Sequence, residues 1–435
     1  MQEELNETRD ERVKKNEKKL GRVGYALILL SAVLISILLT FSLTVKYYFG
    51  GTVKNEEFYR KFEVLAAYID KNAYFEADTE KMKDAALKAY VSSAGDRYTT
   101  YYNGDEFRAR EENNKGHYEG IGVAINNAEV VYEGKIRSLI EIITVHRGSP
   151  ADDAGLRQGD LIYSVDTENG EVFAFDVDTD LFSSYVKGVV GTSVSMTILR
   201  RIDGELQKQK FLVERRDVKI KSAVYDLHKQ YADVGIVTIS EFDLNTPKML
   251  SEAFDSLLGQ GIEKIVIDMR NNGGGELNSV IACASYFLNE GDLIMSAKSN
   301  KGDVVKYRTR VRTYGGKYEL CSVSNDDIGK YRTVKTVILV NENTASAAEL
   351  LTAVFRDYEL AEIVGEKTFG KGTMQTIYSL DTYGIDGGLK LTTDVYFPPC
   401  GESYEGVGIL PDTVVERGDG EEDLQLKAAI EILNR

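Results

Sequence analysis

The sequence predicts a multidomain protein: an N-terminal apolar helix and a helical arm, then a β-rich module, then an α/β core. Three observations carry this prediction. An uncharged run of 21 residues, Tyr25–Val45, lies near the start of the 435-residue chain. Short segments rich in valine and isoleucine begin at about His117. From about Val218, strand-like segments alternate with amphipathic helical ones, which is typical of an α/β domain.

The apolar run predicts a membrane span. As a helix rising about 1.5 Å per residue, Tyr25–Val45 is long enough to cross a bilayer. A cleaved signal peptide would have a shorter apolar run, and the segment Lys46–Phe49 that follows is typical of an interfacial anchor. Basic residues of the leader, 1–22, lie close to the run and indicate a cytoplasmic leader. We therefore expect a retained signal-anchor helix at 23–47 in the cell membrane, with most of the chain extracytoplasmic; the alternative is a buried core helix.

Apolar side chains recur every three or four residues between Glu56 and Glu112, which predicts a helical arm at 55–115. Nothing in this arm indicates chemistry, so packing or dimerisation is its expected role. Together with a helix predicted at Leu424–Leu433, the arm suggests a homodimer.

The composition limits the partners. Apolar residues make up 43% of the chain, and 53 basic against 69 acidic residues give a formal charge of −16. Such a charge repels phosphate, so we expect no nucleic-acid partner, whereas peptides remain compatible. The three cysteines, Cys283, Cys321 and Cys400, lack metal-ligand spacing and are odd in number, which predicts isolated thiols with one disulfide as the alternative. No metal site or cofactor is predicted.

The β-rich module, expected at 116–215, contains a glycine loop and a turn–helix–turn segment. The loop is Gly120-Ile121-Gly122-Val123, and the segment GSPADDAGLRQGDLI runs from Gly148 to Ile162. On its own the segment is equally typical of a connector. The two together resemble a PDZ domain. That resemblance implies that backbone amides of the loop bind the terminal carboxylate of a peptide, which adds a strand to the sheet.

The α/β core, expected at 216–435, carries a candidate for covalent catalysis without histidine. Ser346 lies 25 residues before Lys371, and Gln375 follows four residues later. A serine nucleophile needs a general base, and a lysine can serve if it is held neutral. This requires its pKa to fall from about 10.4 to roughly 7–8, which burial against apolar neighbours provides. No serine-protease motif surrounds any of the chain's histidines, His117, His146 and His228.

Each of these residues also has a structural interpretation. Ser346 to Glu349 spells Ser-x-x-Glu, the capping-box pattern of a helix start. Lys371, between two glycines, is typical of an exposed turn, and Gln375 of a polar strand face. Capping and catalysis are compatible, because a helix N-terminus offers free N–H groups to an oxyanion. In an alternating strand Lys371, Thr373 and Gln375 share one face, which allows the amide to orient the amine.

A glycine-rich loop follows the predicted strand KIVIDM. Its sequence, Asp268–Gly275, is typical either of a flexible joint or of an anion-binding loop whose N–H groups point at developing negative charge. It lacks the Gly-Lys-Ser/Thr ending of a phosphate-binding loop. We expect Asp268 and Arg270 to be structural ion partners, and the basic segment Ser296–Arg332 to be a solvated hairpin.

Three separated blocks, IDMRNNGGG, VNENTASAAE and EKTFGKGTMQ, occur in that order behind the PDZ-like module. With the closing segment GVGILPD, Gly406–Asp412, they resemble the carboxy-terminal processing peptidases, also called tail-specific proteases. The resemblance runs from about Phe58 to the C-terminus and includes AGDRYTTYY at Ala94–Tyr102. It implies a peptidase core with a crotonase-like α/β fold.

Carried over by position, the resemblance implies Ser346 as nucleophile, Lys371 as general base and Gln375 as the residue that orients the base. It also implies an oxyanion hole built from the Ala347 amide and one glycine amide of the 273–275 run. The candidates within that run are Gly273 and Gly274.

The chain departs from the family pattern without losing a reacting group. Many relatives have proline where Gly273 and Arg97 stand, and serine where Ala348 stands. The first departure predicts a less rigid glycine loop.

The implied function is that of a single-pass membrane serine endopeptidase. Its PDZ module captures the C-terminal tail of a protein substrate, Ser346 is acylated, and water hydrolyses the acyl-enzyme without a metal or cofactor. Two alternatives stay open: a membrane-tethered PDZ scaffold with an inactive core, and a crotonase-like acyl-CoA enzyme.

Overall fold

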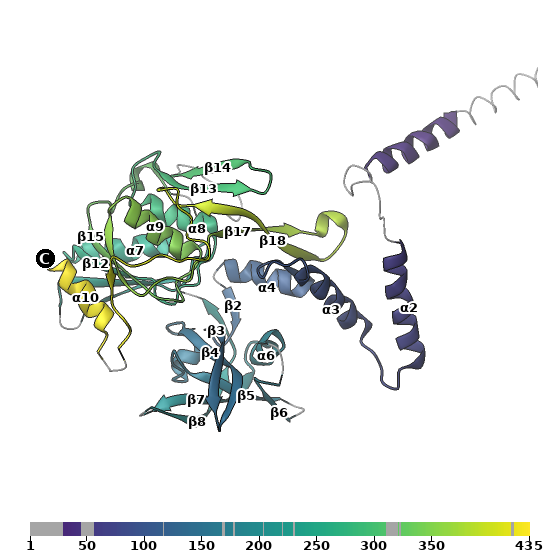
Figure 1. Cartoon of the computed structure of the whole chain (residues 1–435), viewed down its shortest axis with the longest axis horizontal. Coiled ribbons are helices and arrows are strands. Elements are labelled where there is room, and N and C mark those ends of the chain that lie inside the picture. The colour runs from purple at the N-terminus through teal and green to yellow at the C-terminus, as the bar shows by residue number, and fades with distance from the viewer. Residues whose placement is uncertain are drawn as a thin grey trace, which may run out of the picture. The chain divides into compact units, whose positions relative to one another are not determined.

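The computed structural model contains two compact units, residues 1–85 and 86–435 (Figure 1). The residues that it describes are 29–44, 56–115, 117–167, 170–176, 179–202, 204–219, 221–228, 231–309, 321, 323–418 and 422–435.

The first unit includes the predicted membrane span. Residues 29–44 are helical, while the rest of the predicted span, 23–47, lies outside the described residues. Within the described part of the chain, no helix combines the length and the apolarity needed to cross a membrane. The unit continues with α2 (Glu56–Asn72) and the first part of α3 (Thr79–Ser92), which follow the predicted helical periodicity.

The end of the predicted arm belongs to the second unit and is not entirely helical. Strand β1 (Thr100–Asn103) precedes α4 (Gly104–Asn114) and pairs antiparallel with β18 (Gly387–Phe397). The helical periodicity did not predict β1, because a strand of four residues is too short to show alternation. The segment after α3 therefore contributes an edge to a sheet of the core.

The β-rich module has the predicted order of elements. Its strands are β3 (Val123–Tyr132), β4 (Lys135–Val145), β5 (Leu161–Thr167), β6 (Gly170–Phe173), β7 (Ser193–Ile202) and β8 (Glu205–Glu214), in the order β3-β4-β5-β7-β8 with β6 on β5. Helix α5 (Pro150–Asp153) is the short helix of the predicted turn–helix–turn segment, and α6 (Thr179–Val186) precedes β7. At the ends of the module β2 (His117–Gly120) pairs with β9 (Arg216–Lys219).

The main sheet of the core has six strands in the order β10-β11-β12-β15-β16-β19. They are β10 (Ala223–Leu227), β11 (Val234–Ile239), β12 (Lys264–Asp268), β15 (Lys335–Val340), β16 (Ala361–Gly365) and β19 (Thr413–Val414). Only β10 is antiparallel to its neighbour. Because β12 and β15 are parallel neighbours, the loops that follow them meet at one edge of the sheet. These loops are the glycine loop and the Ser346 turn.

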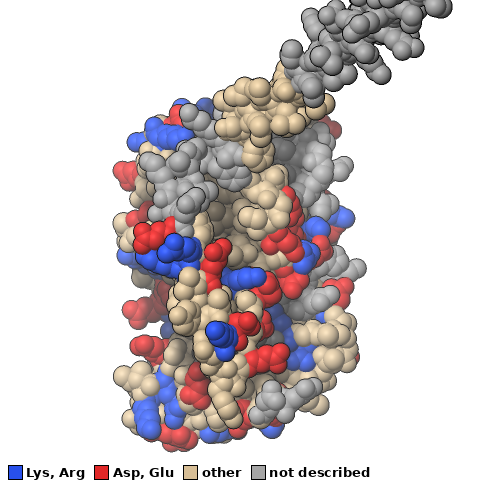
Figure 2. All heavy atoms as spheres, turned by 90° about the vertical axis from the view of Figure 1, so that its right-hand side faces the viewer, with Lys and Arg blue, Asp and Glu red and all other residues tan. Residues whose placement is uncertain are grey.

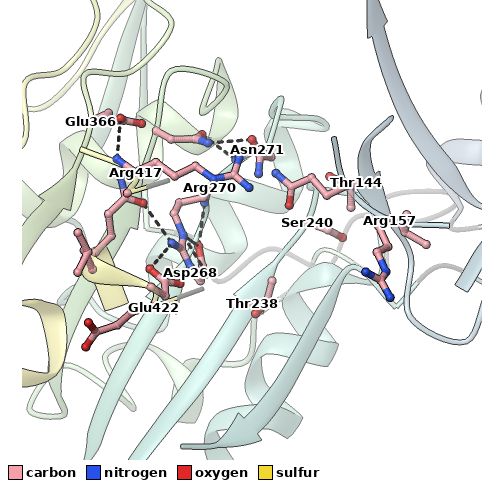
Figure 3. Close-up of a pocket in the computed structure, with 17 residues that line it drawn as sticks. Thr144, Arg157, Thr238, Ser240, Asp268, Arg270, Asn271, Glu366, Arg417 and Glu422 are labelled. Carbon is pink, nitrogen blue, oxygen red and sulfur yellow. Dashed lines mark hydrogen bonds and ion pairs between the residues drawn. The ribbon is translucent and has the colours of Figure 1, made fainter. Parts of the chain in front are cut away.

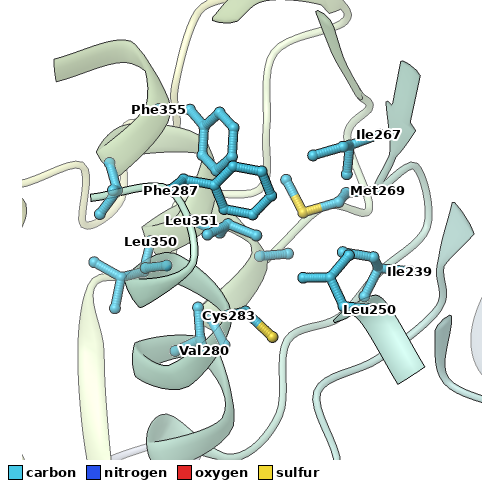
Figure 4. Close-up of a cluster of buried hydrophobic side chains, with 14 of the residues drawn as sticks. Ile239, Leu250, Ile267, Met269, Val280, Cys283, Phe287, Leu350, Leu351 and Phe355 are labelled. Carbon is cyan, nitrogen blue, oxygen red and sulfur yellow. The ribbon is translucent and has the colours of Figure 1, made fainter. Parts of the chain in front are cut away.

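Helices cover both faces of this sheet. One face packs against α7 (Thr246–Gly259), α8 (Leu277–Ser285) and α9 (Ala347–Asp357), and the other against α10 (Leu424–Leu433). Alternate residues of β12 serve the two cores: Ile265 and Ile267 face the three helices, and Val266 faces α10. In the larger core the rings of Phe287 and Phe355 lie 4.7 Å apart (Figure 4). This contact fixes α9, the helix that Ser346 begins.

A second sheet of the core has the order β1-β18-β13-β14, with β17 (Thr373–Ser379) also paired to β18. Strands β13 (Leu293–Ser299) and β14 (Val304–Arg308) form an antiparallel hairpin, which confirms the predicted hairpin over the described part of that segment. Residues 310–320 and 322 lie outside the described part. All three cysteines are free thiols, buried at Cys283 and Cys321 and exposed at Cys400.

Acidic and basic side chains are interspersed over the face of the molecule in Figure 2. The net charge of −16 is thus not gathered into one acidic field on this face.

Candidate active site

The turn after β15 places Ser346 at the N-terminus of α9. The φ angle of Ser346 is 56°, a left-handed conformation that is uncommon for a residue other than glycine. Such strain persists where surrounding structure fixes it, often at functional turns. The Ser346 N–H donates to Glu349 Oε2 at 2.9 Å, and the predicted capping box is confirmed.

The Glu349 carboxylate links this turn to the lysine loop. It is fully buried, and it accepts hydrogen bonds from Ser346 N (2.9 Å), Lys371 N (2.8 Å), Gly370 N (2.7 Å) and Thr368 Oγ1 (2.6 Å). Charge-assisted hydrogen bonds of this kind compensate the cost of burying a carboxylate. One side chain therefore holds the main chains of both Ser346 and Lys371. The capping pattern predicted only the first of these contacts.

The closing segment GVGILPD shapes the loop that carries Lys371. The Gly406 N–H donates to Gly370 O at 2.8 Å. Gly370 has φ 92°, and a Cβ there would lie 2.7 Å from Gly408 N, so only glycine fits this approach. The family-like end motif thus has a local structural purpose.

The side chain of Lys371 lies in a mixed aromatic and cationic setting. Its ammonium nitrogen lies 4.3 Å from the centroid of the Tyr98 ring. Burial lowers the pKa of Lys371, and the charges of Lys390 and Arg97 lower it further, against the opposing effect of two carboxylates. A lower pKa increases the fraction of neutral amine, the form that can accept a proton.

Gln375 lies on β17, but this strand does not alternate as predicted. The register shifts between Met374 and Gln375, as at a β-bulge, and Lys371 precedes the strand. A bulge re-aims the side chains on either side of it. The Gln375 amide nitrogen donates to the hydroxyls of Thr373 and Thr392, both at 3.2 Å. The side chains of Thr373 and Gln375 are nevertheless in contact, and both residues line one cavity with Lys371. The role of Gln375 toward Lys371 stays a prediction.

The glycine loop lies directly against the Ser346 turn. A Cβ at Gly274 would lie 2.8 Å from Ser346 Cβ, and Gly274 has φ 100°, so this position requires glycine. The Gly274 N–H is already bonded to Asn272 Oδ1 at 2.9 Å. Gly273, in contrast, lies on the wall of the cavity beside Ser346. Of the two candidate oxyanion amides, the geometry favours Gly273.

Hydrogen bonds offset the predicted lower rigidity of this loop. Asn272 is fully buried, and its amide nitrogen donates to Ile239 O at 2.8 Å. The Ala345 N–H donates to Asn272 O at 2.9 Å, and the Phe242 N–H donates to Gly274 O at 2.9 Å. The loop is thus bonded both to the neighbouring strand end and to the turn that carries Ser346.

One cavity of about 680 Å³ is lined by most of the predicted catalytic and oxyanion residues. It is lined by the three residues of the predicted catalytic set and by two of the predicted oxyanion residues: Ser346, Lys371, Gln375, Gly273 and Ala347. Its apolar wall is formed by Leu277, Tyr307, Leu350 and Met374. A hydroxyl at a helix N-terminus, a lysine of lowered pKa and backbone amides around one cavity can together perform acyl transfer.

Sequence reasoning missed Tyr396, which also lines this cavity. Its hydroxyl donates to Lys371 O at 2.8 Å. Burial raises the pKa of Tyr396. Tyr396 therefore contacts the lysine main chain and lines the same cavity as Ser346. Its place on β18 gives no sequence signal, because the contact depends on long-range packing.

The β-rich module has a groove of its own, about 210 Å³ in volume. It lies between β3 and α6 and is lined by Val123, Ile125, Ile162, Phe182, Ser183, Val186 and Lys187. Of the four predicted peptide-binding residues, Val123 lines the groove, Ile121 is fully buried, and Gly120 ends β2. Gly122 has φ 78°, and a Cβ there would lie 2.3 Å from Ser149 Cβ. The sharp turn at the head of the groove therefore requires this glycine.

A second cavity of about 620 Å³ lies away from Ser346 (Figure 3). Arg270 lines this cavity and pairs with Asp268 at 2.6 Å and with Asp423 at 2.8 Å. The predicted Asp268–Arg270 ion pair is thus confirmed. This pairing ties the end of β12 to the start of α10. It gives Arg270 a structural role and leaves it outside the catalytic cavity.

Comparisons with known proteins agree with this geometry. Residues 233–415 match the family model for peptidase family S41, and residues 141–200 match that for a PDZ domain. The core of the chain is thus similar to peptidase family S41. A CtpA-like serine protease of Staphylococcus haemolyticus is 29% identical over 394 residues, covering 90% of this chain and 72% of the relative. One from Staphylococcus aureus strain COL is 28% identical over 404 residues, covering 91% and 73%.

Two solved structures share the fold of this chain. The photosystem II D1 C-terminal processing protease matches with a TM-score of 0.55 at 23% identity, covering 86% of this chain and 91% of that one. A protein described as an S41 protease from Bacteroides fragilis matches with a TM-score of 0.53 at 16% identity, covering 84% and 94%. The predicted combination of a PDZ module with a carboxy-terminal processing peptidase core is confirmed. The chain is thus a serine-type peptidase.

Proposed function

We propose that this serine-type peptidase cleaves peptide bonds with Ser346 as nucleophile and Lys371 as general base. The observation that carries the proposal is their placement around one cavity, where burial lowers the pKa of Lys371 and Ser346 begins a helix. A neutral lysine can take the proton that serine must lose. The family match favours a peptidase over the acyl-CoA alternative.

The proposed reaction proceeds through an acyl-enzyme. Ser346 Oγ attacks the scissile carbonyl carbon as its proton passes to Lys371 Nζ, and the carbonyl oxygen becomes an oxyanion. The amides of Gly273 and Ala347 donate to this oxyanion. As the C–N bond breaks, Lys371 returns the proton to the leaving amine. Water then attacks the ester with Lys371 again as base, which releases the acid and restores Ser346.

The PDZ module is proposed to capture the C-terminal tail of the substrate. Its groove is apolar along β3 and α6 and ends at Val123, beside the glycine turn. Such a groove accepts an added strand with an apolar last side chain, while backbone amides bind the carboxylate. The substrates are then proteins or peptides with exposed C-terminal tails.

Anchoring in the cell membrane by residues 23–47 and an extracytoplasmic catalytic part remain part of the proposal, on the strength of the uncharged run Tyr25–Val45. A homodimer is proposed from helix α2, whose Leu65 and Tyr68 side chains are 60% and 69% exposed. Apolar side chains exposed to this extent on one helix favour a partner.

Purified protein and an unstructured polypeptide with a free C-terminus test the proposal. Ser346→Ala is expected to abolish cleavage, because it removes the proposed nucleophile, and Lys371→Ala to lower it at least a thousandfold. Cleavage that survives Ser346→Ala would refute the assignment. An uncleaved substrate with the unchanged chain would instead favour the inactive-scaffold alternative.

A further inference from the structure

A loop outside the three motif blocks reaches into the site. The segment between α3 and β1 contains Asp96, whose Oδ2 accepts from the Thr99 hydroxyl at 2.6 Å and from the Thr392 hydroxyl at 2.7 Å. The Tyr98 N–H donates to Asp96 Oδ1 at 3.3 Å. Burial opposes ionisation of Asp96, but these hydrogen bonds outweigh it and lower its pKa. The carboxylate is therefore ionised at neutral pH.

An ionised carboxylate fixes the direction of the hydrogen bonds beyond it. Asp96 can only accept, so the single proton of the Thr392 hydroxyl points to Asp96. The lone pairs of that hydroxyl are then left to accept from Gln375 Nε2, which lies 3.2 Å away. The amide nitrogen of Gln375 must face Thr392, and its oxygen is left for a donor elsewhere.

We propose that Asp96 and Thr392 are positioning residues that hold the Gln375 amide with its oxygen available to the Lys371 ammonium. This inference rests on the proposed function of Lys371 as base. The same loop supplies Tyr98, whose ring faces the ammonium at 4.3 Å. One segment near residue 96 thus contacts Lys371 through Tyr98 and is linked to Gln375 through Thr392.

The charges that face Lys371 come from several elements. Lys390 of β18 and Arg97 of the loop disfavour its ammonium, while Asp96 and Glu405 favour it. Removing the charge of Asp96 therefore makes the ammonium less stable. A residue that merely supports the fold would leave the titration of Lys371 unchanged.

The strand pair β17–β18 offers a matched control. Thr392 and Thr393 are adjacent, and each bonds through its hydroxyl to a β17 side chain: Thr392 to Gln375, and Thr393 to Thr376 at 2.8 Å. Thr392→Val removes the hydroxyl that links Asp96 to Gln375. Thr393→Val removes an equivalent hydroxyl–hydroxyl bond, to Thr376, on the other face of the strand. Both substitutions keep the shape of the side chain.

The test measures kcat, KM and pH–rate profiles of the full chain with the same unstructured polypeptide. Thr392→Val is expected to lower kcat roughly tenfold with KM little changed, because a reacting group loses its orientation. Thr392→Ser should restore kcat, and Thr393→Val should match the unchanged chain. Asp96→Asn should lower kcat and move the half-maximal pH downward.

Two results would overturn the proposal that the hydrogen-bonded chain Asp96–Thr392–Gln375 orients the Gln375 amide. One is equal kcat for Thr392→Val and Thr393→Val; the other is an Asp96→Asn profile with an unmoved midpoint. Ser346→Ala separates this failure from that of the proposed function. If Ser346→Ala is inactive while Thr392→Val behaves like the unchanged chain, only the positioning role of Asp96 and Thr392 is wrong.

Discussion

At the scale of single residues, the neighbours of Lys371 set its strength as a base. Its pKa is lowered by burial and then by the positive charges of Lys390 and Arg97. The amine therefore loses its proton at a lower pH than an exposed lysine, whose pKa is about 10.4. With Lys371 as the proposed base, the neutral amine is the reactive form, so activity should rise with pH and reach half its plateau below that value.

Replacing Lys390 tests this electrostatic account. Lys390→Gln removes a positive charge, so the Lys371 ammonium becomes more stable, its pKa rises, and the half-maximal pH of cleavage should move upward. Initial rates from about pH 6 to about pH 10 measure the shift. Lys427→Gln, at an exposed position on α10, is the control and should leave the profile in place. A profile that is flat over this range, or one that Lys390→Gln does not move, would contradict Lys371 as the titrating base.

The sequence predicts those site residues whose signal is local. Ser346 and its cap partner Glu349 lie one helical turn apart, and Lys371 stands between two glycines, so both positions could be read from short segments. The orientation of Gln375 could not, because the shift in register before it leaves no pattern. Thr392 and Tyr396 enter the site through strand pairing and packing, which a single sequence does not encode locally.

At the scale of elements, Glu349 couples helix α9 to the lysine loop. Its two oxygens accept from four donors and offer no proton in return. The main chains at Ser346 and Lys371 are consequently bonded to the same carboxylate oxygen. This explains how two segments on separate elements can keep a fixed spacing.

Glu349→Gln tests this coupling. The new NH₂ group must face either the Ser346 and Lys371 amides or the Thr368 and Gly370 donors. In either orientation, hydrogen-bond donors in a buried site face another donor and lose their acceptor. We expect a loss of folding stability on the order of 3 kcal/mol and a fall in kcat larger than the fall in folded protein. Urea unfolding and kcat on the folded fraction measure the two effects.

The matched control for this substitution is Glu431→Gln, at an exposed position of α10. It should change neither quantity. Equal stabilities for the two variants, or a Glu349→Gln enzyme with unchanged kcat, would mean that the carboxylate does not couple the two segments.

Elements of regular pattern were predictable and short ones were not. Alternation from Val218 predicted the main sheet, and the apolar spacing at Leu424–Leu433 predicted α10. The four-residue strand β1 was missed, although its pairing with β18 brings the Asp96 loop to the site. Its partner lies almost 290 residues later in the chain, a distance over which a sequence pattern carries no pairing information.

At the scale of the whole molecule, the proposed tail-binding groove and the proposed catalytic cavity share one chain. A substrate held by its tail presents the rest of its length to the cavity at a raised effective concentration. The benefit appears in KM, because holding the tail does not alter the acyl-transfer step. It requires a free terminal carboxylate and an apolar last side chain.

Blocking the carboxylate tests this whole-chain account. A polypeptide with an amidated C-terminus should show a KM roughly tenfold higher at similar kcat, since the charge-assisted hydrogen bonds to the carboxylate are lost. Ile125→Glu, which places a negative charge in the groove, should raise the KM of the free-tailed polypeptide in the same way. Val131→Glu, on the same strand and 69% exposed, is the matched control and should not. If neither amidation of the substrate's C-terminus nor Ile125→Glu changes KM, the cavity recognises its substrate without the PDZ module.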